Sequence, residues 1–317
     1  MRRSEEAKVA LALACHLGER DTKPLSVGEF WRVVGRADQL RGLAGRSPSE
    51  LVAEGIKPEL SERVVSLLDE SLAVALAAER LEQQGISTIT SFDDAYPQRL
   101  LARLQDVAPP ILHVAEDPSM ISIAGIGIVG SRDVDEKGIE VAQRAATVAA
   151  DAGMPVVSGG ARGIDQQAMR AANRAGGQVV GVLGDSLLRR VKDPDMRRVI
   201  LEGRVALVST HRPDLGFTVA GAMARNKVIY GLSEVTLVVA CTEGKGGTWE
   251  GATESLRRDF GRVKVWVGDG SPPGNSALAA LGAKPVEQID LPGLIDVEAE
   301  PDGSPPEQLG LLGEQHG

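Results

Sequence analysis

The residues with the clearest chemical role form a glycine-rich turn at residues 158–165, Ser-Gly-Gly-Ala-Arg-Gly-Ile-Asp. An apolar run ending at Val157 predicts a strand before the turn, and a helical pattern follows it. Such a turn leaves backbone N–H groups unpaired at the positive end of a helix, where an anion binds. Arg162 adds charge, while Asp165 suits either the site or a purely structural helix cap. The candidate phosphate-binding residues are Ser158, Gly159, Gly160, Arg162, Gly163 and Asp165.

A second turn, Gly130-Ser131-Arg132, closes an earlier apolar segment. Gly130 permits close approach of a ligand, Ser131 supplies a hydroxyl and an amide, and Arg132 supplies a bidentate phosphate fork. The letters at 125–130 match the dinucleotide fingerprint Gly-x-Gly-x-x-Gly, but here the glycines lie inside the predicted strand. We therefore expect no NAD site, and no other cofactor is predicted.

A third group, Arg225, Asn226 and Lys227, lies in the stretch 219–232, which predicts a helix. We place these residues near the start of that helix, where cations oppose the helix dipole. A negative ligand outside the helix would compensate the opposed charge. A solvated basic edge explains the same residues without a ligand.

A fourth turn, residues 243–250, follows a strand predicted to end at Ala240. Its candidate anion-binding residues are Lys245, Gly247 and Thr248. The turn lacks the spacing of the ATPase phosphate-binding loop, so ATP hydrolysis is not expected. Trp249 suits either stacking on a base or packing in the core.

These turns require a scaffold that brings several strand ends to one edge. From residue 121 onward, short apolar runs alternate with helical patterns, which indicates an α/β fold with a parallel sheet and helices on both faces. The predicted strands are 121–129, 155–157, 178–183, 205–208, 235–240 and 263–267, and the predicted helices are 136–151, 163–174, 194–202, 219–232 and 248–259. Such sheets bind ligands at the carboxyl ends of their strands.

The composition restricts the class of protein. Aromatic residues make up 3% of the 317 residues, so a mechanism that stacks many bases is not expected. Two cysteines exclude a disulfide scaffold and a cysteine-based zinc site, and the four histidines show no metal-ligand spacing. No nucleophile–base pair is visible, so no catalytic residue is predicted. No apolar run is long enough for a membrane span, and we expect a cytoplasmic protein.

The net charge of −9 is unevenly distributed. From Glu287 to the end there are eight acids and no Lys or Arg, which leaves 36 acids against 35 bases in residues 1–286. Residues 183–227 contain nine bases and five acids. Local basic clusters can therefore dominate the electrostatic field despite the acidic total.

The chain divides into four segments. Residues 1–85 hold short amphipathic stretches at 8–17, 27–34, 48–54 and 60–83, which predict a small all-α domain. Residues 86–118 form a connector in which four prolines prevent a long regular element. Residues 119–290 form the α/β domain. Residues 291–317 are rich in Pro, Gly and acids, and we expect a disordered tail.

The ordered set of motifs resembles the DprA/Smf family of DNA-processing proteins. The matching segments are GIVGSR at 127–132, SGGARGID at 158–165, ARNKVIYGLS at 224–233, the Gly-Thr pair at 247–248, YPQRL at 96–100 and PPIL at 109–112. The resemblance implies a Rossmann-like domain preceded by a SAM-like or helix-hairpin-helix-like domain. It also implies a homodimer that binds single-stranded DNA without catalysis, loads a RecA-type recombinase, and acts in natural transformation.

The chain departs from the family pattern at several positions. Met169 replaces the usual histidine, Lys227 replaces the second arginine of the RNR motif, and Lys245-Gly-Gly-Thr248 replaces a Ser-Gly-Ser turn. No counterpart of a C-terminal winged helix follows Asp290. These differences indicate a divergent member of the family.

Two other functions fit the same residues. Residues 246–250, Gly-Gly-Thr-Trp-Glu, partly resemble a motif of nucleotide-binding, N-glycoside-hydrolysing Rossmann-like proteins, in which Glu250 would act. The second alternative is a sensor in phage defence, which would bind DNA or a nucleotide with the same predicted turns. For the DNA-binding function we expect Arg132→Ala and Arg225→Ala to weaken DNA binding with little loss of fold stability.

Overall fold

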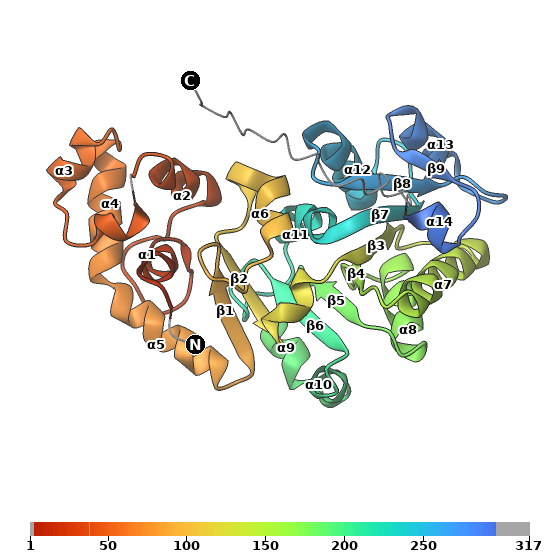
Figure 1. The fold of residues 1–317 in the computed structure, drawn as a ribbon, viewed down its shortest axis with the longest axis horizontal. Coiled ribbons are helices and arrows are strands. Elements are labelled where there is room, and N and C mark those ends of the chain that lie inside the picture. Colours follow the sequence, from red (N-terminus) through yellow and green to blue (C-terminus); the bar gives the residue numbers. More distant parts are fainter. Residues whose placement is uncertain (1–2, 38, 296–317) are drawn as a thin grey trace, which may run out of the picture.

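The computed structural model describes residues 3–37 and 39–295, and the first part of this chain is helical (Figure 1). Its helices are α1 Glu5–Ala14, α2 Val27–Val34, η1 Leu40–Leu43, α3 Pro48–Ala53, α4 Pro58–Asp69 and α5 Ser71–Glu82. Ser26 and Ser47 begin α2 and α3 with capping boxes, each closed by a glutamate three residues later. The stretch 60–83, expected as one helix, divides at Glu70 into α4 and α5.

The rest of the described chain is built on one nine-stranded sheet with the order β1-β2-β6-β5-β4-β3-β7-β8-β9. The strands are β1 Ile86–Thr90, β2 Ile111–Ala115, β3 Gly125–Gly130, β4 Val156–Ser158, β5 Val179–Val182, β6 Val205–Ser209, β7 Ser233–Ala240, β8 Arg262–Trp266 and β9 Lys284–Val286. Strands β3 to β9 run parallel, and β2 is antiparallel to both β1 and β6. The Rossmann-like parallel sheet predicted from the sequence is confirmed.

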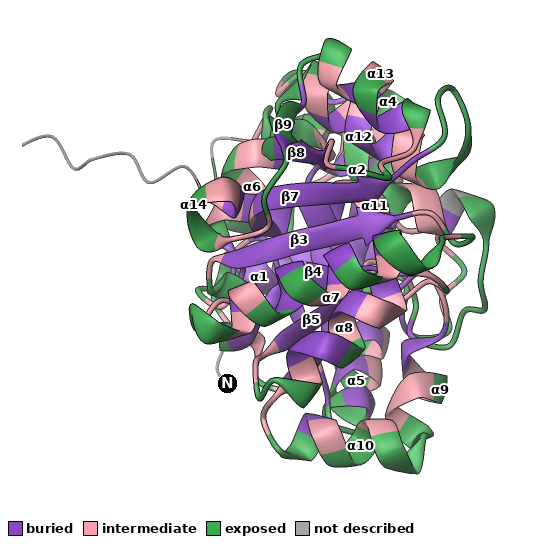
Figure 2. Ribbon diagram, turned by 90° about the vertical axis from the view of Figure 1, so that its right-hand side faces the viewer, coloured by how far each residue is buried: buried purple, intermediate pink, exposed green. Residues whose placement is uncertain are grey.

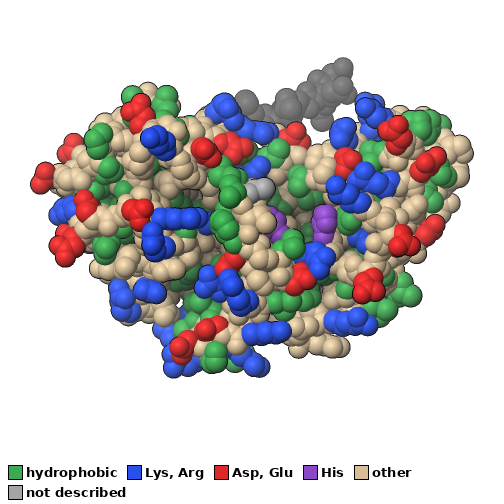
Figure 3. Space-filling view, turned by 180° about the vertical axis from the view of Figure 1, so that it is seen from behind, with side chains coloured by type: hydrophobic (Ala, Val, Ile, Leu, Met, Phe, Trp, Pro, Cys, Tyr) green, Lys and Arg blue, Asp and Glu red, His purple; other side chains and the backbone are tan. Residues whose placement is uncertain are grey.

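Helices cover both faces of the sheet, as predicted. The elements between and after the strands are α6 Gln98–Leu104, η2 Gln105–Val107, η3 Pro118–Ser122, α7 Glu136–Asp151, α8 Ile164–Arg174, α9 Leu187–Lys192, α10 Pro194–Leu201, α11 Val219–Leu232, α12 Gly246–Arg258, α13 Pro273–Ala280 and α14 Leu291–Leu294. Apolar residues of α7, α8 and α10 pack in one core cluster, and those of α6, α11 and α12 in another. In Figure 2, α7 and α8 cross in front of the buried strands, whose arrowheads point to the right. The arrowheads mark the carboxyl ends of the strands, and the side of the molecule toward which they point faces the viewer in Figure 3. On that face, groups of Lys and Arg side chains alternate with acidic side chains.

Strand β3 is shorter than predicted because residues 118–122 form the 3₁₀ helix η3. The glycines of 125–130 lie within the strand, as expected. Their role is close packing: a Cβ at Gly125 would lie 2.6 Å from the Pro155 carbonyl oxygen, and one at Gly127 would lie 2.5 Å from Thr236 Oγ1. These glycines allow the neighbouring strands to approach, which agrees with the rejection of a dinucleotide fingerprint.

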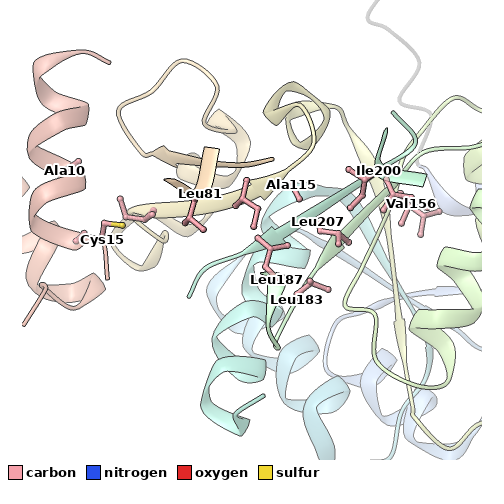
Figure 4. Packing of buried hydrophobic residues seen from close by; sticks show 14 of the residues in the cluster. Ala10, Cys15, Leu81, Ala115, Val156, Leu183, Leu187, Ile200 and Leu207 are labelled. Atoms are coloured by element: carbon pink, nitrogen blue, oxygen red, sulfur yellow. The ribbon is translucent and has the colours of Figure 1, made fainter. Parts of the chain in front are cut away.

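The sheet begins before the first strand that the sequence predicts, because residues 86–118 supply β1, α6 and β2. Trp31 Nε1 of the helical part donates a 2.8 Å hydrogen bond to the Ala108 carbonyl in this segment. Figure 4 shows Cys15, Leu81 and Ala115 in the same apolar cluster as Leu207 of the sheet. The helical part and the sheet therefore share a continuous core.

Two further observations concern the described residues alone. Within 3–37 and 39–295, no helix combines the length and the apolar character needed to cross a membrane. The tail expected at 291–317 begins with α14, and residues 296–317 lie outside the described residues.

Candidate anion-binding site

Two adjacent hollows open at the carboxyl ends of the parallel strands. The larger hollow measures about 530 Å³ and lies where β3 and β7 end, and the smaller, about 360 Å³, lies beside it towards β5. Chain connections reverse direction between β3 and β7, the usual place for a ligand in an open α/β sheet. The predicted site residues that line one or both hollows are Gly130, Ser131, Arg132, Gly159, Gly160, Arg162, Asp165, Arg225, Asn226, Lys245, Gly247 and Thr248.

Three predicted site residues are not among the residues that line the hollows. Ser158 is buried, and its hydroxyl donates a 2.6 Å hydrogen bond to the Ile128 carbonyl, which joins β4 to β3. Gly163 has φ +87°, and a Cβ there would lie 2.4 Å from the Ser131 carbonyl oxygen. Lys227 lies on α11, half-buried. Ser158 and Gly163 therefore shape the turns instead of lining the hollows.

Asp165 joins the first two turns. Its carboxylate accepts a 3.4 Å hydrogen bond from the Ala161 N–H and is also hydrogen-bonded by the backbone of Gly130 and Gly159. The side chain is buried, and this burial raises its pKa to about 6, against the opposing attraction of Arg225. Because its oxygens face the backbone of both turns, Asp165 holds the walls of the site in place.

Arg225 is the central cation of the site, and the structure corrects its expected position. It is the seventh residue of α11 instead of lying near the helix start, so opposition to the helix dipole does not explain it. Its guanidinium lies against Gly159, where a Cβ would be 1.5 Å from Nη1. The side chain is 7% exposed, and Nε is buried without a hydrogen-bond partner in the described part of the chain. Burial lowers the pKa of Arg225, and Asp165 partly restores it. Arg225 is thus a buried cation that lines both hollows and whose loss of hydration Asp165 offsets only in part.

Phe217 was not predicted as a site residue. It lines both hollows, and Arg132 lies over its ring with the guanidinium carbon 5.8 Å from the ring centroid. All nine aromatic residues are in the described part of the chain, and Phe217 alone is exposed. An exposed aromatic ring with a stacked arginine offers a flat surface to another ring.

The turn before α12 completes the larger hollow. Lys245 immediately precedes α12, and among the described residues no side chain caps the first turn of this helix. The first residues of α12 line the larger hollow, so the backbone N–H groups of this turn lie beside the hollow without a side-chain cap. Asn226 fixes this turn by donating a 3.1 Å hydrogen bond from Nδ2 to the Gly247 carbonyl. Trp249 packs partly against the core and Glu250 is exposed, and neither belongs to the lining of the hollows.

A parallel sheet with helices on both faces and a basic, glycine-walled hollow at its topological switch point defines the class as a Rossmann-like α/β protein. Comparison with known families is more specific. The chain belongs to the DNA recombination-mediator protein A family, whose model matches residues 87–291.

Curated relatives agree with this assignment. The chain is 27% identical over 247 residues to the DNA processing protein DprA of Bacillus subtilis, covering 76% of this chain and 79% of that protein. It is 30% identical over 175 residues to protein Smf of Synechocystis, covering 53% of this chain and 43% of the relative. It is 29% identical over 187 residues to protein Smf of Escherichia coli, or 58% and 49% of the two chains. The chain thus spans about half the length of the two Smf relatives.

Solved structures show the same fold. DprA from Streptococcus pneumoniae superposes with a TM-score of 0.66 at 20% identity, over 91% of this chain and 96% of that one. DprA from Helicobacter pylori gives a TM-score of 0.51 at 21% identity, over 64% and 92%. The latter structure was described for its single-stranded DNA binding mode.

Proposed function

We propose that this chain is a DNA-processing protein that binds single-stranded DNA in the two hollows. The observation that carries the proposal is the convergence of three glycine turns on Arg132 and Arg225 at one edge of the sheet. Three basic residues and one acid line the larger hollow: Arg132, Arg225, Lys245 and Asp165. This local positive charge suits a phosphodiester backbone.

The dimensions of the site favour a single strand over a duplex. Both volumes fall within the range of about 300–1000 Å³ that is typical of small-ligand sites. A nucleotide of a flexible strand can enter such a hollow, whereas a duplex keeps its bases paired inside the helix. Phe217 at the shared rim adds a surface on which a base can stack.

Membership of the family also supports three more specific proposals, which concern the oligomeric state, the protein partner and the cellular process. We propose that the protein forms a homodimer, delivers bound DNA to a RecA-type recombinase, and acts in natural transformation. Analytical ultracentrifugation and a strand-exchange assay with the recombinase test these parts separately from DNA binding.

The salt dependence of binding tests the proposed function itself. If about five phosphates are held, the logarithm of the affinity for single-stranded DNA falls with the logarithm of salt concentration with a slope near −3.5. This slope corresponds to roughly a 100-fold loss between 50 and 200 mM salt. Fluorescence anisotropy with labelled oligothymidylate at several salt concentrations measures it. A flat response contradicts binding through phosphates.

Phe217→Ala is expected to weaken binding of oligothymidylate about tenfold, because one base–aromatic stack is lost. Phe217→Trp should retain the affinity. The matched control is Leu215→Ala, which removes an exposed apolar side chain from the same loop and from outside both hollows. Equal affinities of the Phe217→Ala and Leu215→Ala variants would show that the ring does not contact the bases.

A mononucleotide ligand is the second candidate, and the volume of the larger hollow favours it. Hydrolysis of such a ligand receives no support, since Glu250 is exposed and is not among the residues that line the larger hollow. Competition by thymidine monophosphate against oligothymidylate separates the two ligands. Displacement at micromolar mononucleotide, with no gain in affinity for longer strands, would favour the second candidate.

A further inference from the structure

Resting on the proposed function, we infer that the smaller hollow is a second nucleotide subsite, in which Arg190 binds the phosphate next to the one held in the larger hollow. The two hollows share Arg132, Ala161, Phe217 and Arg225 as a common wall. A strand crossing that wall passes directly from one hollow into the other. The DNA-binding unit is then a dinucleotide step.

The charge of the smaller hollow supports an anionic ligand. Four arginines and one acid are among its lining residues: Arg132, Arg162, Arg190, Arg225 and Asp185. Arg162 pairs with Asp133 at 2.7 Å, and Arg225 lies in the field of Asp165. The positive charge offered to a ligand in the smaller hollow therefore comes mainly from Arg132 and Arg190. Among the glycines of its wall, Gly159 and Gly184 make room for Arg225 and Ala222, whereas a Cβ at Gly160 would meet no atom nearer than 3.8 Å. A ligand can therefore approach the backbone at Gly160.

Asp185 does not neutralise these arginines. Its Oδ2 accepts hydrogen bonds from Arg189 at 2.8 Å and from Arg190 at 3.1 Å, so two guanidinium groups share one carboxylate oxygen. Nε of Arg190 is buried and has no hydrogen-bond partner within residues 3–37 and 39–295. A phosphate in the hollow would give Arg190 a second negative partner beside the carboxylate that it shares with Arg189.

The neighbouring arginines provide a matched pair of variants. Arg189 and Arg190 both lie on α9 and both pair with Asp185, but Arg190 alone of the two lines the smaller hollow. Arg189 is also more exposed, at 71% of its side chain against 41% for Arg190. Removing either side chain takes one guanidinium from the same carboxylate, so loss of that ion pair affects both variants.

The test compares Arg190→Ala and Arg189→Ala in the full chain, using calorimetric titration with three probes: thymidine monophosphate, a 5′-phosphorylated thymidine dinucleotide and inorganic phosphate. We expect Arg190→Ala to weaken the dinucleotide about tenfold and to leave the mononucleotide within about twofold. Arg189→Ala should change neither nucleotide by more than about twofold. Wild-type protein should bind the dinucleotide at least about tenfold more tightly than the mononucleotide or inorganic phosphate.

Three outcomes would overturn the inference. The first is that the two variants bind the dinucleotide with equal affinity. The second is that Arg190→Ala loses affinity for the mononucleotide and the dinucleotide to the same extent. The third is that wild-type protein binds inorganic phosphate as tightly as the dinucleotide. A 12-residue oligothymidylate distinguishes these failures from failure of the proposed function. If only the second subsite is wrong, the 12-mer still binds and still depends on Arg132; if the proposed function is wrong, the 12-mer does not bind.

Discussion

Arg225→Met is expected to lower the free energy of unfolding by about 3 kcal/mol at pH 8 and to remove most of the DNA binding, because the substitution leaves Asp165 buried without its cation. Methionine fills nearly the same volume, so the creation of a cavity contributes little to the loss. Equilibrium denaturation in urea measures the stability, and anisotropy measures the binding. The expectation from the sequence that an alanine at this position would spare the fold therefore does not apply to a side chain that is 7% exposed.

The loss of stability in Arg225→Met should depend on pH. Arg225 lowers the pKa of Asp165, which burial has raised to about 6 from 3.8, so removal of the arginine raises that pKa further. A carboxyl group whose pKa is raised on folding contributes stability below its unfolded pKa and loses it as the pH rises through the folded pKa. The variant should therefore be closest to wild type near pH 4 and furthest from it above pH 7.

Two further variants test whether the buried charge of Asp165 causes the loss of stability in Arg225→Met. Lys227→Met changes a cation two residues along the same helix that is not among the residues lining the hollows, and it should leave stability and DNA binding near wild type. Adding Asp165→Asn to Arg225→Met removes the buried charge but also one of the two oxygens that accept backbone hydrogen bonds. It should therefore restore part of the stability lost at pH 8 without restoring the binding. If Arg225→Met unfolds like wild type at pH 8, the attraction between Arg225 and Asp165 is not what stabilises the site.

The glycine turns could be predicted from the sequence because their signal is local. Each follows an apolar run and precedes a helical pattern, and the parallel sheet then requires their strand ends to meet at one edge. Most of the predicted residues accordingly line the two hollows. Ser158 and Gly163 carry the same local signal, but the hydrogen bond of the one and the backbone conformation of the other give them a role in shaping the turns, outside the lining of the hollows.

Other features depend on contacts between distant residues, which spacing does not reveal. Asp165 and Arg225 are 60 positions apart, so neither the raised pKa of the acid nor the burial of the arginine could be inferred from either motif. Phe217 is one of nine aromatic residues, and its exposure follows from the fold around it. Strands β1 and β2 were missed because they are short, lie among four prolines, and pair antiparallel at the sheet edge.

Arg132→Ala is expected to weaken binding of oligothymidylate about 30-fold and to leave the free energy of unfolding unchanged. Arg132 is exposed and lines both hollows, so its fork reaches the strand where it crosses the shared wall, and its loss removes no buried contact. The slope of affinity against salt should become shallower by about 0.7, the value for one phosphate of a single strand. Anisotropy at several salt concentrations measures both effects.

Two variants define what Arg132 contributes. Arg132→Lys keeps the charge but loses the fork and the stacking on Phe217, so it should restore the salt slope and only part of the affinity. Arg162→Ala removes an exposed arginine that lines the smaller hollow alone and pairs with Asp133 at 2.7 Å, so it should cost no more than about threefold. An Arg132→Ala variant with wild-type affinity and slope would place the DNA elsewhere, since Arg132 is one of the residues that line both hollows.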